Sequence, residues 1–259
     1  MQYGLVRRLV AEAVGTAILV LFGAGSVIAA LTIGKGHLDF AGVGFIALAF
    51  AIAIAVAVYG FLPVSGAHIN PAVTFALAVT RRFPWVEVVP YFVAQLIGGA
   101  VGGLLIVAAF GTKAIDLGAG ATTLGAGVSY GQGIVAEALG TFLLMFAVMA
   151  TAVDGRMPAG WAGLIVGLAV SAAIMVMLPL TGGSLNPART FGPDLALALF
   201  GGTVHWGQFL LYWIGPLIGA AVAALLYDLV ARPRAAAALQ CAEDEPPREA
   251  PQVKLPAKR

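Results

Sequence analysis

The chain has 259 residues, of which 61% are hydrophobic and only 10% are charged. Soluble domains carry about 25% charged residues, so this composition excludes an ordinary soluble domain and indicates a membrane protein with several spans. The net charge of +2 gives no reason to expect nucleic-acid binding, and the single cysteine, Cys241, excludes an internal disulfide framework.

Three apolar segments in the first half are long enough to cross a membrane, at about residues 9–33, 41–62 and 85–110. Between the second and the third lies a polar break that ends in Asn70, directly before a proline. Asn can accept from the free N–H groups of a helix start, and Pro at the first helical position loses only a donor that had no partner. The run that follows, residues 71–80, is shorter than the about 20 residues of a span and predicts a half-helix.

The pattern returns after a connector rich in glycine and threonine, residues 111–131. Further spans are expected at about residues 133–153, 161–178 and 206–229. A second polar break ends in Asn186 before a proline, and a second short run follows it, residues 187–199. This half therefore predicts three more spans and another half-helix.

Three blocks occur in both halves in the same order. Ala11–Thr16 matches Ala136–Thr141, the two Asn-Pro-Ala breaks match each other, and Tyr91–Gly98 matches Tyr212–Gly219. The sequence thus predicts a duplication, with repeats at residues 9–110 and 132–230. Each repeat has three spans, an odd number, so the second copy enters from the opposite side and the half-helices meet near mid-membrane.

Basic residues set the orientation, because cytoplasmic loops carry an excess of Lys and Arg. Lys35 and Lys113 fall on one side of the predicted membrane, together with the connector. The other side carries Arg7, Arg8, Arg81, Arg82, Arg156, Arg232 and Arg234. We expect a plasma or inner membrane protein with both termini in the cytoplasm, an extracellular connector, and a disordered cytoplasmic tail over residues 231–259.

These features together resemble the aquaporin, or major intrinsic protein, family. The resemblance covers about Leu9 to Leu229 and rests on six spans in inverted repeat, two Asn-Pro-Ala half-helices, the Glu12 and Glu137 blocks, and Arg189 just after the second motif. It implies an all-α membrane protein with six transmembrane helices and two re-entrant half-helices. The expected protein is a water-channel-like bacterial or archaeal member that forms a homotetramer.

Asn70 and Asn186 are the predicted pore centre. An Asn whose oxygen caps its own helix keeps amide N–H donors that point beyond the helix end. Two such ends facing each other would donate to one passing water, and each adds about half a positive charge from its helix dipole. A water held in this way cannot easily take part in proton hopping, and the positive potential repels cations.

Irregular backbone precedes both caps, and such backbone at membrane depth lines a wet cavity or is buried in protein. We expect a ladder of pore carbonyls from Gly66, Ala67, His68, Gly182 and Ser184. The His68 ring has no second His or Cys beside it in the sequence. A structural role, or a role for its carbonyl alone, is therefore favoured, and no metal or cofactor is expected.

Glu12 and Glu137 are carboxylates inside predicted spans, which by default suggests function. They could couple transport to protons or ions, as in a secondary transporter. Alternatively, each accepts hydrogen bonds from free backbone N–H groups of the neighbouring break. Their symmetric placement, one in each repeat, favours this structural role.

The resemblance places Arg189 at an outer constriction. It also places Phe50, Ile174 and Gly183 there, because their sequence separations from the two asparagines are those of the family's constriction residues. Strict water channels typically have His at the Ile174 position, and glycerol channels have Gly there with two aromatic residues. This chain has neither set, so the filter is atypical. We expect an aperture that is less polar and wider than a strict water filter, although Thr190 is closer to the water branch.

We expect a passive channel for water, and for small uncharged solutes, that excludes protons and ions. A facilitator chiefly for glycerol or for metalloid hydroxides, such as arsenite and boric acid, is the alternative. A coupled transporter is weaker, because Arg189 is the only other charged residue expected near mid-membrane. An enzyme is not expected, since the spans contain no nucleophile–base pair and no cluster of metal ligands.

Overall fold

The computed structural model describes residues 2–158 and 160–231. Cys241 and residues 232–259 of the predicted tail lie outside this part. Within it, no strand occurs, and six helical segments are long and apolar enough to cross a membrane. The predicted all-α membrane fold is therefore confirmed.

The spans follow the predicted order. The first three spans are α1 (Leu5–Ile18), which a π-helical turn η1 (Leu19–Ala24) joins to α2 (Gly25–Ile33), then α3 (Phe40–Ser65) and α5 (Trp85–Phe110). The last three are α7 (Tyr130–Val148) with the π-helical turn η3 (Met149–Val153), α8 (Ala162–Thr181), and α10 (Leu211–Val230), which follows the short turn η4 (Trp206–Gln208). The connector contains a short helix α6 (Thr112–Asp116) and a 3-10 turn η2 (Gly118–Gly120). The connector is thus folded rather than a simple link.

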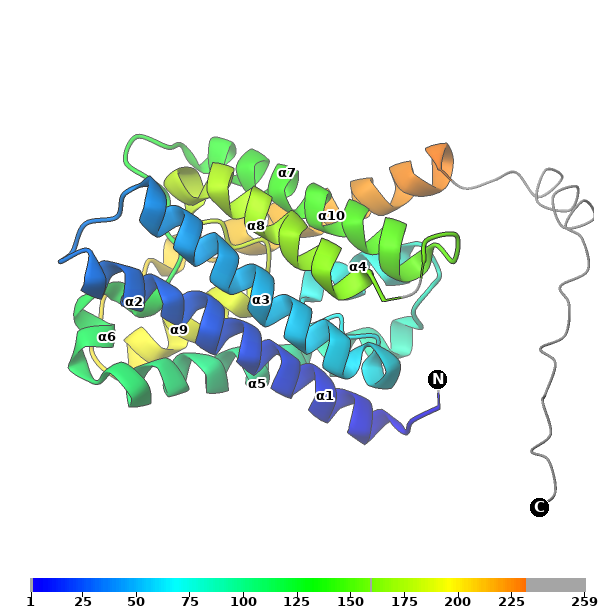
Figure 1. The fold of residues 1–259 in the computed structure, drawn as a ribbon, viewed down its shortest axis with the longest axis horizontal. Helices are drawn as coiled ribbons and strands as arrows, with labels where there is room; N and C mark the ends of the chain where they lie inside the picture. The colour runs from blue at the N-terminus through cyan, green and yellow to red at the C-terminus, as the bar shows by residue number, and fades with distance from the viewer. Residues whose placement is uncertain (1, 159, 232–259) are drawn as a thin grey trace, which may run out of the picture.

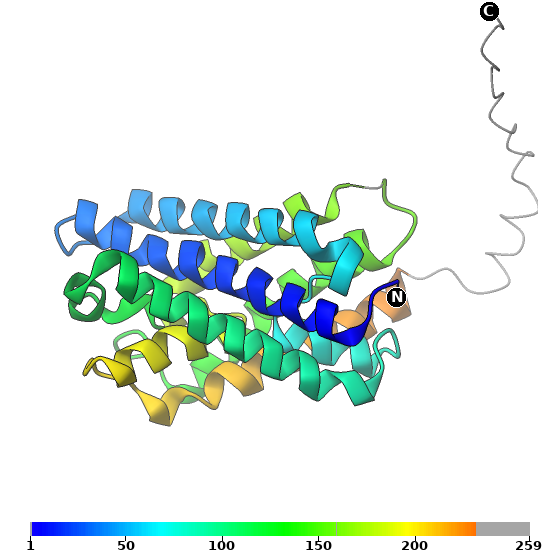
Figure 2. The same ribbon diagram turned by 90° about the horizontal axis from the view of Figure 1, so that it is seen from below.

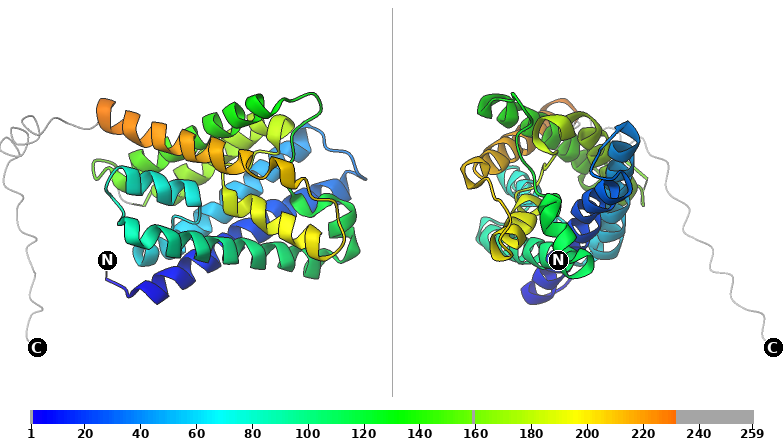
Figure 3. Two further views of the ribbon diagram at one scale, coloured as in Figure 1. Left: turned by 180° about the vertical axis from the view of Figure 1, so that it is seen from behind. Right: turned by 90° about the vertical axis from the view of Figure 1, so that its left-hand side faces the viewer.

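Two short helices, α4 (Pro71–Val79) and α9 (Pro187–Leu199), follow the two polar breaks. They lie at opposite ends of the bundle: α4 near the end where α1 begins, and α9 near the end where α2 finishes (Figure 1). The views from below and from behind show the same opposed placement of α4 (cyan) and α9 (yellow) (Figures 2 and 3). Each half-helix packs on the third span of the other repeat, α4 on α10 and α9 on α5.

Two pairs of helices cross closely at the last glycines of the repeated blocks Tyr91–Gly98 and Tyr212–Gly219. A Cβ on Gly98 would lie 2.1 Å from the Ala13 carbonyl oxygen, and one on Gly219 would lie 2.0 Å from that of Ala138. These glycines let α5 approach α1 and let α10 approach α7 to backbone contact. The two crossings are equivalent, as expected for a duplicated fold.

Two helices continue past the residues at which the sequence suggested that they stop. The spans expected to end at residues 62 and 178 run through Pro63 to Ser65 and through Pro179 to Thr181. A proline inside a helix removes one backbone hydrogen bond and strains the turn before it, but the residues after it can remain helical. The chain turns instead at Gly66 and Gly182, whose φ angles of +90° and +77° suit glycine.

The first helix starts at Leu5 and therefore contains Arg8, which the sequence placed before the span. Arg8 is buried, and its guanidinium donates to both carboxylate oxygens of Glu87 on α5, at 2.5 and 2.7 Å. A bidentate ion pair offsets the cost of burying the charge. This pairing lets the helix begin one turn earlier than its apolar pattern indicates.

Candidate pore site

The break before α4 is organised by Glu12, a fully buried carboxylate on α1. One carboxylate oxygen accepts from the Ser65 hydroxyl at 2.7 Å and from the His68 N–H at 2.9 Å. The other accepts from the Ile69 N–H at 2.6 Å and from the Gln95 amide at 2.8 Å. Glu12 thus binds the backbone donors that the irregular segment leaves without helical partners.

Glu137 on α7 repeats this arrangement beside the second break. It is fully buried, and one oxygen accepts from the Thr181 hydroxyl at 2.6 Å and from the Ser184 N–H at 2.9 Å. Its other oxygen accepts from the Leu185 N–H at 2.6 Å. The two carboxylates therefore bind equivalent donors in the two repeats.

The residues just before the two asparagines adopt left-handed backbone angles, φ +44° at Ile69 and +58° at Leu185. Their side chains point at glycines: a Cβ on Gly15 would lie 2.7 Å from Ile69 Cγ2, and one on Gly140 would lie 2.3 Å from Leu185 Cδ2. The repeated Ala-Glu-Ala-x-Gly-Thr block is explained by this contact. Its Glu binds the loop, and its Gly leaves space for the strained residue.

A pair of tyrosines, which the sequence did not single out for this role, also fixes the breaks. The Tyr91 hydroxyl donates to the Ser65 carbonyl at 2.9 Å, and the Tyr212 hydroxyl donates to the Thr181 carbonyl at 2.9 Å. Both carbonyls belong to the last residue of a span, where helical partners are missing. The matched tyrosines in the repeated blocks were the available signal.

Asn70 and Asn186 are the N-caps of α4 and α9, and the structure brings them together. The Asn70 side-chain oxygen accepts from the Ala72 N–H at 2.9 Å, and that of Asn186 accepts from the Ala188 N–H at 3.0 Å. Their amide nitrogens cross over: Asn70 donates to the carbonyl of Leu185 and Asn186 to that of Ile69, both at 2.9 Å. Each amide retains a second N–H.

Both asparagines line a cavity of about 490 Å³ whose wall includes Phe50 and Arg82. The wall is largely apolar, with residues such as Ile54, Val58, Val73, Leu77, Leu144 and Val166. Of the predicted carbonyl positions, Gly66, Ala67, His68 and Ser184 line this cavity. Gly182 is the turn residue after α8 and is not part of the wall.

The His68 ring is packed rather than free. Its Nδ1 lies 3.0 Å from the Thr74 hydroxyl. The ring also meets Phe83 edge-on, with centroids 4.8 Å apart, and lies 5.2 Å from the Tyr91 ring. These contacts fix the ring on the wall side of the cavity. Among the residues that the structure describes, no group of three or more His, Cys, Asp or Glu could hold a metal ion.

Beyond the cavity lies Arg189, one turn into α9. Its guanidinium carbon is 5.2 Å from the centre of the Phe50 ring, and its Nη1 donates to the Gly120 carbonyl of η2 at 2.7 Å. Within the described part of the chain, its buried Nε has no hydrogen-bond partner. Arg189 and Phe50 are each only 2% exposed, so both side chains are buried where they meet.

Ile174 and Gly183 form the other close pair of the predicted filter. A Cβ on Gly183 would lie 3.5 Å from Ile174 Cγ1, and Ile174 is 1% exposed. The four predicted filter positions thus form two close pairs, Arg189 with Phe50 and Ile174 with Gly183. Neither Ile174 nor Gly183 adds a polar side chain.

The connector supplies contacts that the sequence did not reveal. Gly120, at φ +75°, packs so closely that a Cβ there would lie 2.4 Å from the Ala24 carbonyl oxygen. This fit holds the Gly120 carbonyl where Arg189 donates to it. Thr122 hydrogen-bonds Thr190 at 2.9 Å. Asp194, also on α9, is buried and interacts electrostatically with Arg189. The glycine cluster over residues 118–120 was the signal for this turn.

Six spans around a lumen, with two helix N-termini and two asparagine amides meeting in its middle, define a membrane channel scaffold. The family model for major intrinsic proteins matches residues 1–227, and the chain belongs to this aquaporin family.

Curated relatives and a solved structure agree with this assignment. A probable aquaporin AqpM from Archaeoglobus fulgidus is 49% identical over 246 residues, which cover 90% of this chain and 100% of the relative. Glycerol uptake facilitator protein 3 from Lactiplantibacillus plantarum is 36% identical, with 89% of this chain and 99% of the relative covered. The aquaglyceroporin from Plasmodium falciparum has a TM-score of 0.78 at 26% identity and covers 88% of this chain and 97% of its own.

Proposed function

We propose that this chain is a passive channel for water and small uncharged solutes. The observation that carries the proposal is the crossed pair of asparagines at the start of α4 and α9, which line one cavity. Each keeps one amide N–H that can donate a hydrogen bond to a passing oxygen. The helix N-termini behind them add positive potential at the same point.

Proton exclusion follows from this arrangement. A water that accepts from both Asn70 and Asn186 has its own hydrogens turned toward neighbouring waters, so a proton cannot hop through it in either direction. The apolar wall offers few other hydrogen-bond partners. Cations meet the two helix ends and then Arg189, and their loss of hydration is not compensated.

Arg189, Phe50, Ile174 and Gly183 are the proposed filter. The Arg189 guanidinium, whose Nη1 donates to the Gly120 carbonyl, is the proposed donor to a passing solute. Ile174 and Gly183 present no polar side chain opposite it, which favours solutes that carry both hydroxyl and apolar surface. Glycerol and metalloid hydroxides are therefore the second candidate substrates, in line with the similarity to a glycerol facilitator.

A scaffold role for Glu12 and Glu137 fits their surroundings better than proton coupling. Both are fully buried, and all four carboxylate oxygens accept at least one hydrogen bond. Protonation would break a contact that shapes the loop beside each asparagine. We also propose a homotetramer, a plasma or inner membrane location, and an orientation with the α10 end in the cytoplasm.

Stopped-flow light scattering on liposomes that contain the purified chain tests the proposal. Shrinkage in an impermeant osmolyte measures water permeability, and re-swelling measures the entry of glycerol or boric acid. We expect fast shrinkage that does not depend on a proton gradient. Liposomes that shed water no faster than empty ones would refute the proposed function, and uptake that requires a proton gradient would favour coupled transport.

A further inference from the structure

The cavity opens at the end of the bundle where α1 begins and α10 finishes. Its last wall residues there are Arg82, Phe83, Ala152 and Val153, and we call this opening the Arg82 mouth. Arg82 is the only charged residue in the cavity wall within the described part of the chain. A charged residue in an otherwise uncharged wall calls for an explanation.

Comparison of the two repeats shows that the arginines at this mouth are an addition to the shared fold. Arg82 N–H donates to the Leu77 carbonyl at 2.7 Å, and the equivalent Gly202 N–H donates to the Leu197 carbonyl at 2.8 Å. Gly201 has φ +79° after α9, whereas the matching residue after α4 is an arginine, Arg81, at φ +60°. A non-glycine residue in this region is strained, and such strain points to a functional demand.

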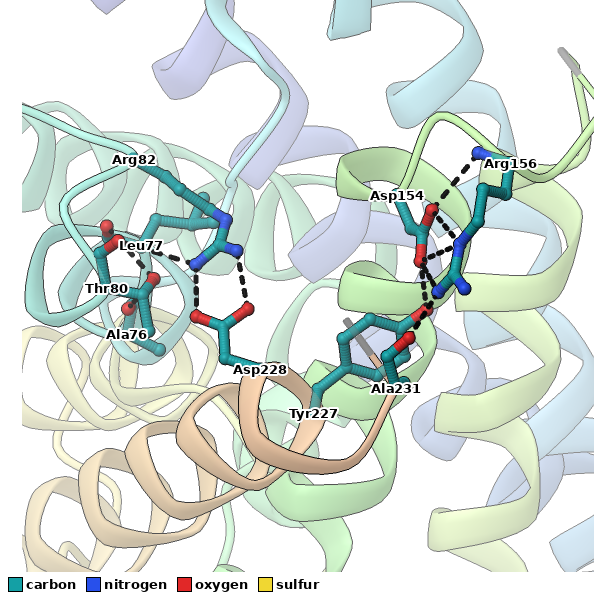
Figure 4. Close-up of polar contacts among 9 residues, drawn as sticks. All are labelled: Ala76, Leu77, Thr80, Arg82, Asp154, Arg156, Tyr227, Asp228 and Ala231. Atoms are coloured by element: carbon teal, nitrogen blue, oxygen red, sulfur yellow. Dashed lines mark hydrogen bonds and ion pairs between the residues drawn. The ribbon is translucent and has the colours of Figure 1, made fainter. Parts of the chain in front are cut away.

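The Arg82 side chain is held by Asp228, near the end of α10 (Figure 4). Nη1 donates to one carboxylate oxygen at 2.7 Å, and Nη2 donates to the other at 2.6 Å. Nη1 also lies 3.4 Å from the Thr80 carbonyl oxygen. The two side chains are 20% and 25% exposed, so the pair is half-buried and has the parallel geometry that makes such pairs specific.

A second polar cluster binds the same end of α10 (Figure 4). Asp154 pairs with Arg156 and accepts from the Tyr227 hydroxyl at 2.7 Å, and Arg156 donates to the Ala231 carbonyl at 2.7 Å. None of these residues lines the cavity. This cluster therefore provides a control that loosens α10 with no change to a side chain of the wall.

We propose that Asp228 is a positioning residue that holds the Arg82 guanidinium in the wall and thereby keeps the Arg82 mouth open to neutral solutes. Without the carboxylate, the long and flexible arginine side chain loses its anchor and samples the lumen. There it obstructs passage and adds uncompensated positive charge. The inference rests on the proposed channel function and concerns the rate at one mouth rather than the filter.

The test compares water permeability of liposomes that contain equal amounts of wild-type chain, Asp228→Asn, Asp228→Glu, Arg82→Gln/Asp228→Asn and Asp154→Asn. Asp228→Asn should lower permeability by about twofold to fivefold, because loss of a half-buried ion pair changes a side-chain equilibrium by about that factor. The double variant should regain wild-type permeability, since it has no cation left to enter the lumen. Asp228→Glu should behave as wild type, and Asp154→Asn should have no effect.

Three results would overturn the inference: an Asp228→Asn variant as fast as wild type, a double variant as slow as Asp228→Asn, or an equal loss in Asp154→Asn. The second and third would mean that the ion pair only stabilises the helix end. Failure of the channel itself is recognised separately, because the wild-type chain would then be as slow as empty liposomes.

Discussion

Replacing Glu137 with Gln tests whether the buried carboxylates act as scaffold. One oxygen of Glu137 accepts from the Ser184 N–H, and the other accepts from the Leu185 N–H. An amide presents one NH2 group, so in either orientation it faces a backbone N–H and leaves that donor without an acceptor. An unsatisfied buried donor costs about 1–3 kcal/mol, and the loss of charge-assisted bonds adds about 1 kcal/mol, so we expect a destabilisation of about 2–4 kcal/mol.

Thermal unfolding of the detergent-purified variant measures this loss, and stopped-flow scattering measures its effect on the pore. We expect a lower unfolding midpoint together with slower water passage, because the affected loop carries Asn186. Glu12→Gln should cost a similar amount, since Glu12 accepts from the equivalent His68 and Ile69 N–H groups. Asp116→Asn, at an exposed site, is the control for charge. An unchanged midpoint with abolished proton-driven uptake would refute the scaffold role.

Three further outcomes are expected. Ile174→His should raise the ratio of water to glycerol permeability in liposomes by adding a donor to the filter, and an unchanged ratio would remove Ile174 from it. Arg189→Val should admit larger solutes, with glycerol and urea swelling as the measurement; an unaltered solute range would contradict its role. Arg156 and Tyr227 hold the pKa of Asp154 below its usual value, so its stabilising effect is complete above about pH 3.9 and is lost as the pH falls further. The difference in unfolding midpoint between wild type and Asp154→Asn should therefore be equal at pH 7 and pH 5 and should shrink below about pH 4.

The spans and half-helices were predictable because their signals are local. Apolar length predicts a span wherever the chain must satisfy its backbone within lipid. An Asn before Pro marks a helix start through its own side chain, and both half-helices begin at that proline. The inverted repeat followed from matched blocks and an odd number of spans.

Features that depend on distant partners were not predictable in the same way. The early start of α1 depends on the Arg8–Glu87 pair, whose members are 79 residues apart in sequence. The Tyr91 and Tyr212 hydroxyls have targets in other spans, and the Gly120 carbonyl reaches Arg189 across 69 residues. Hydropathy and periodicity contain no information about such pairs. Internal repetition was the one clue, since equivalent residues occur in both copies.

The crossed hydrogen bonds of the two asparagine amides at the centre have a consequence for biogenesis. Asn70 donates to a carbonyl 115 residues later in sequence, and Asn186 donates to one 117 residues earlier. When only the first repeat has been synthesised, neither of these hydrogen bonds can form. The core of that half then still has polar groups without partners at bilayer depth. The hydrogen bonds at the midpoint of the conduit therefore form late in insertion, and neither half of the polypeptide can satisfy its central polar groups alone.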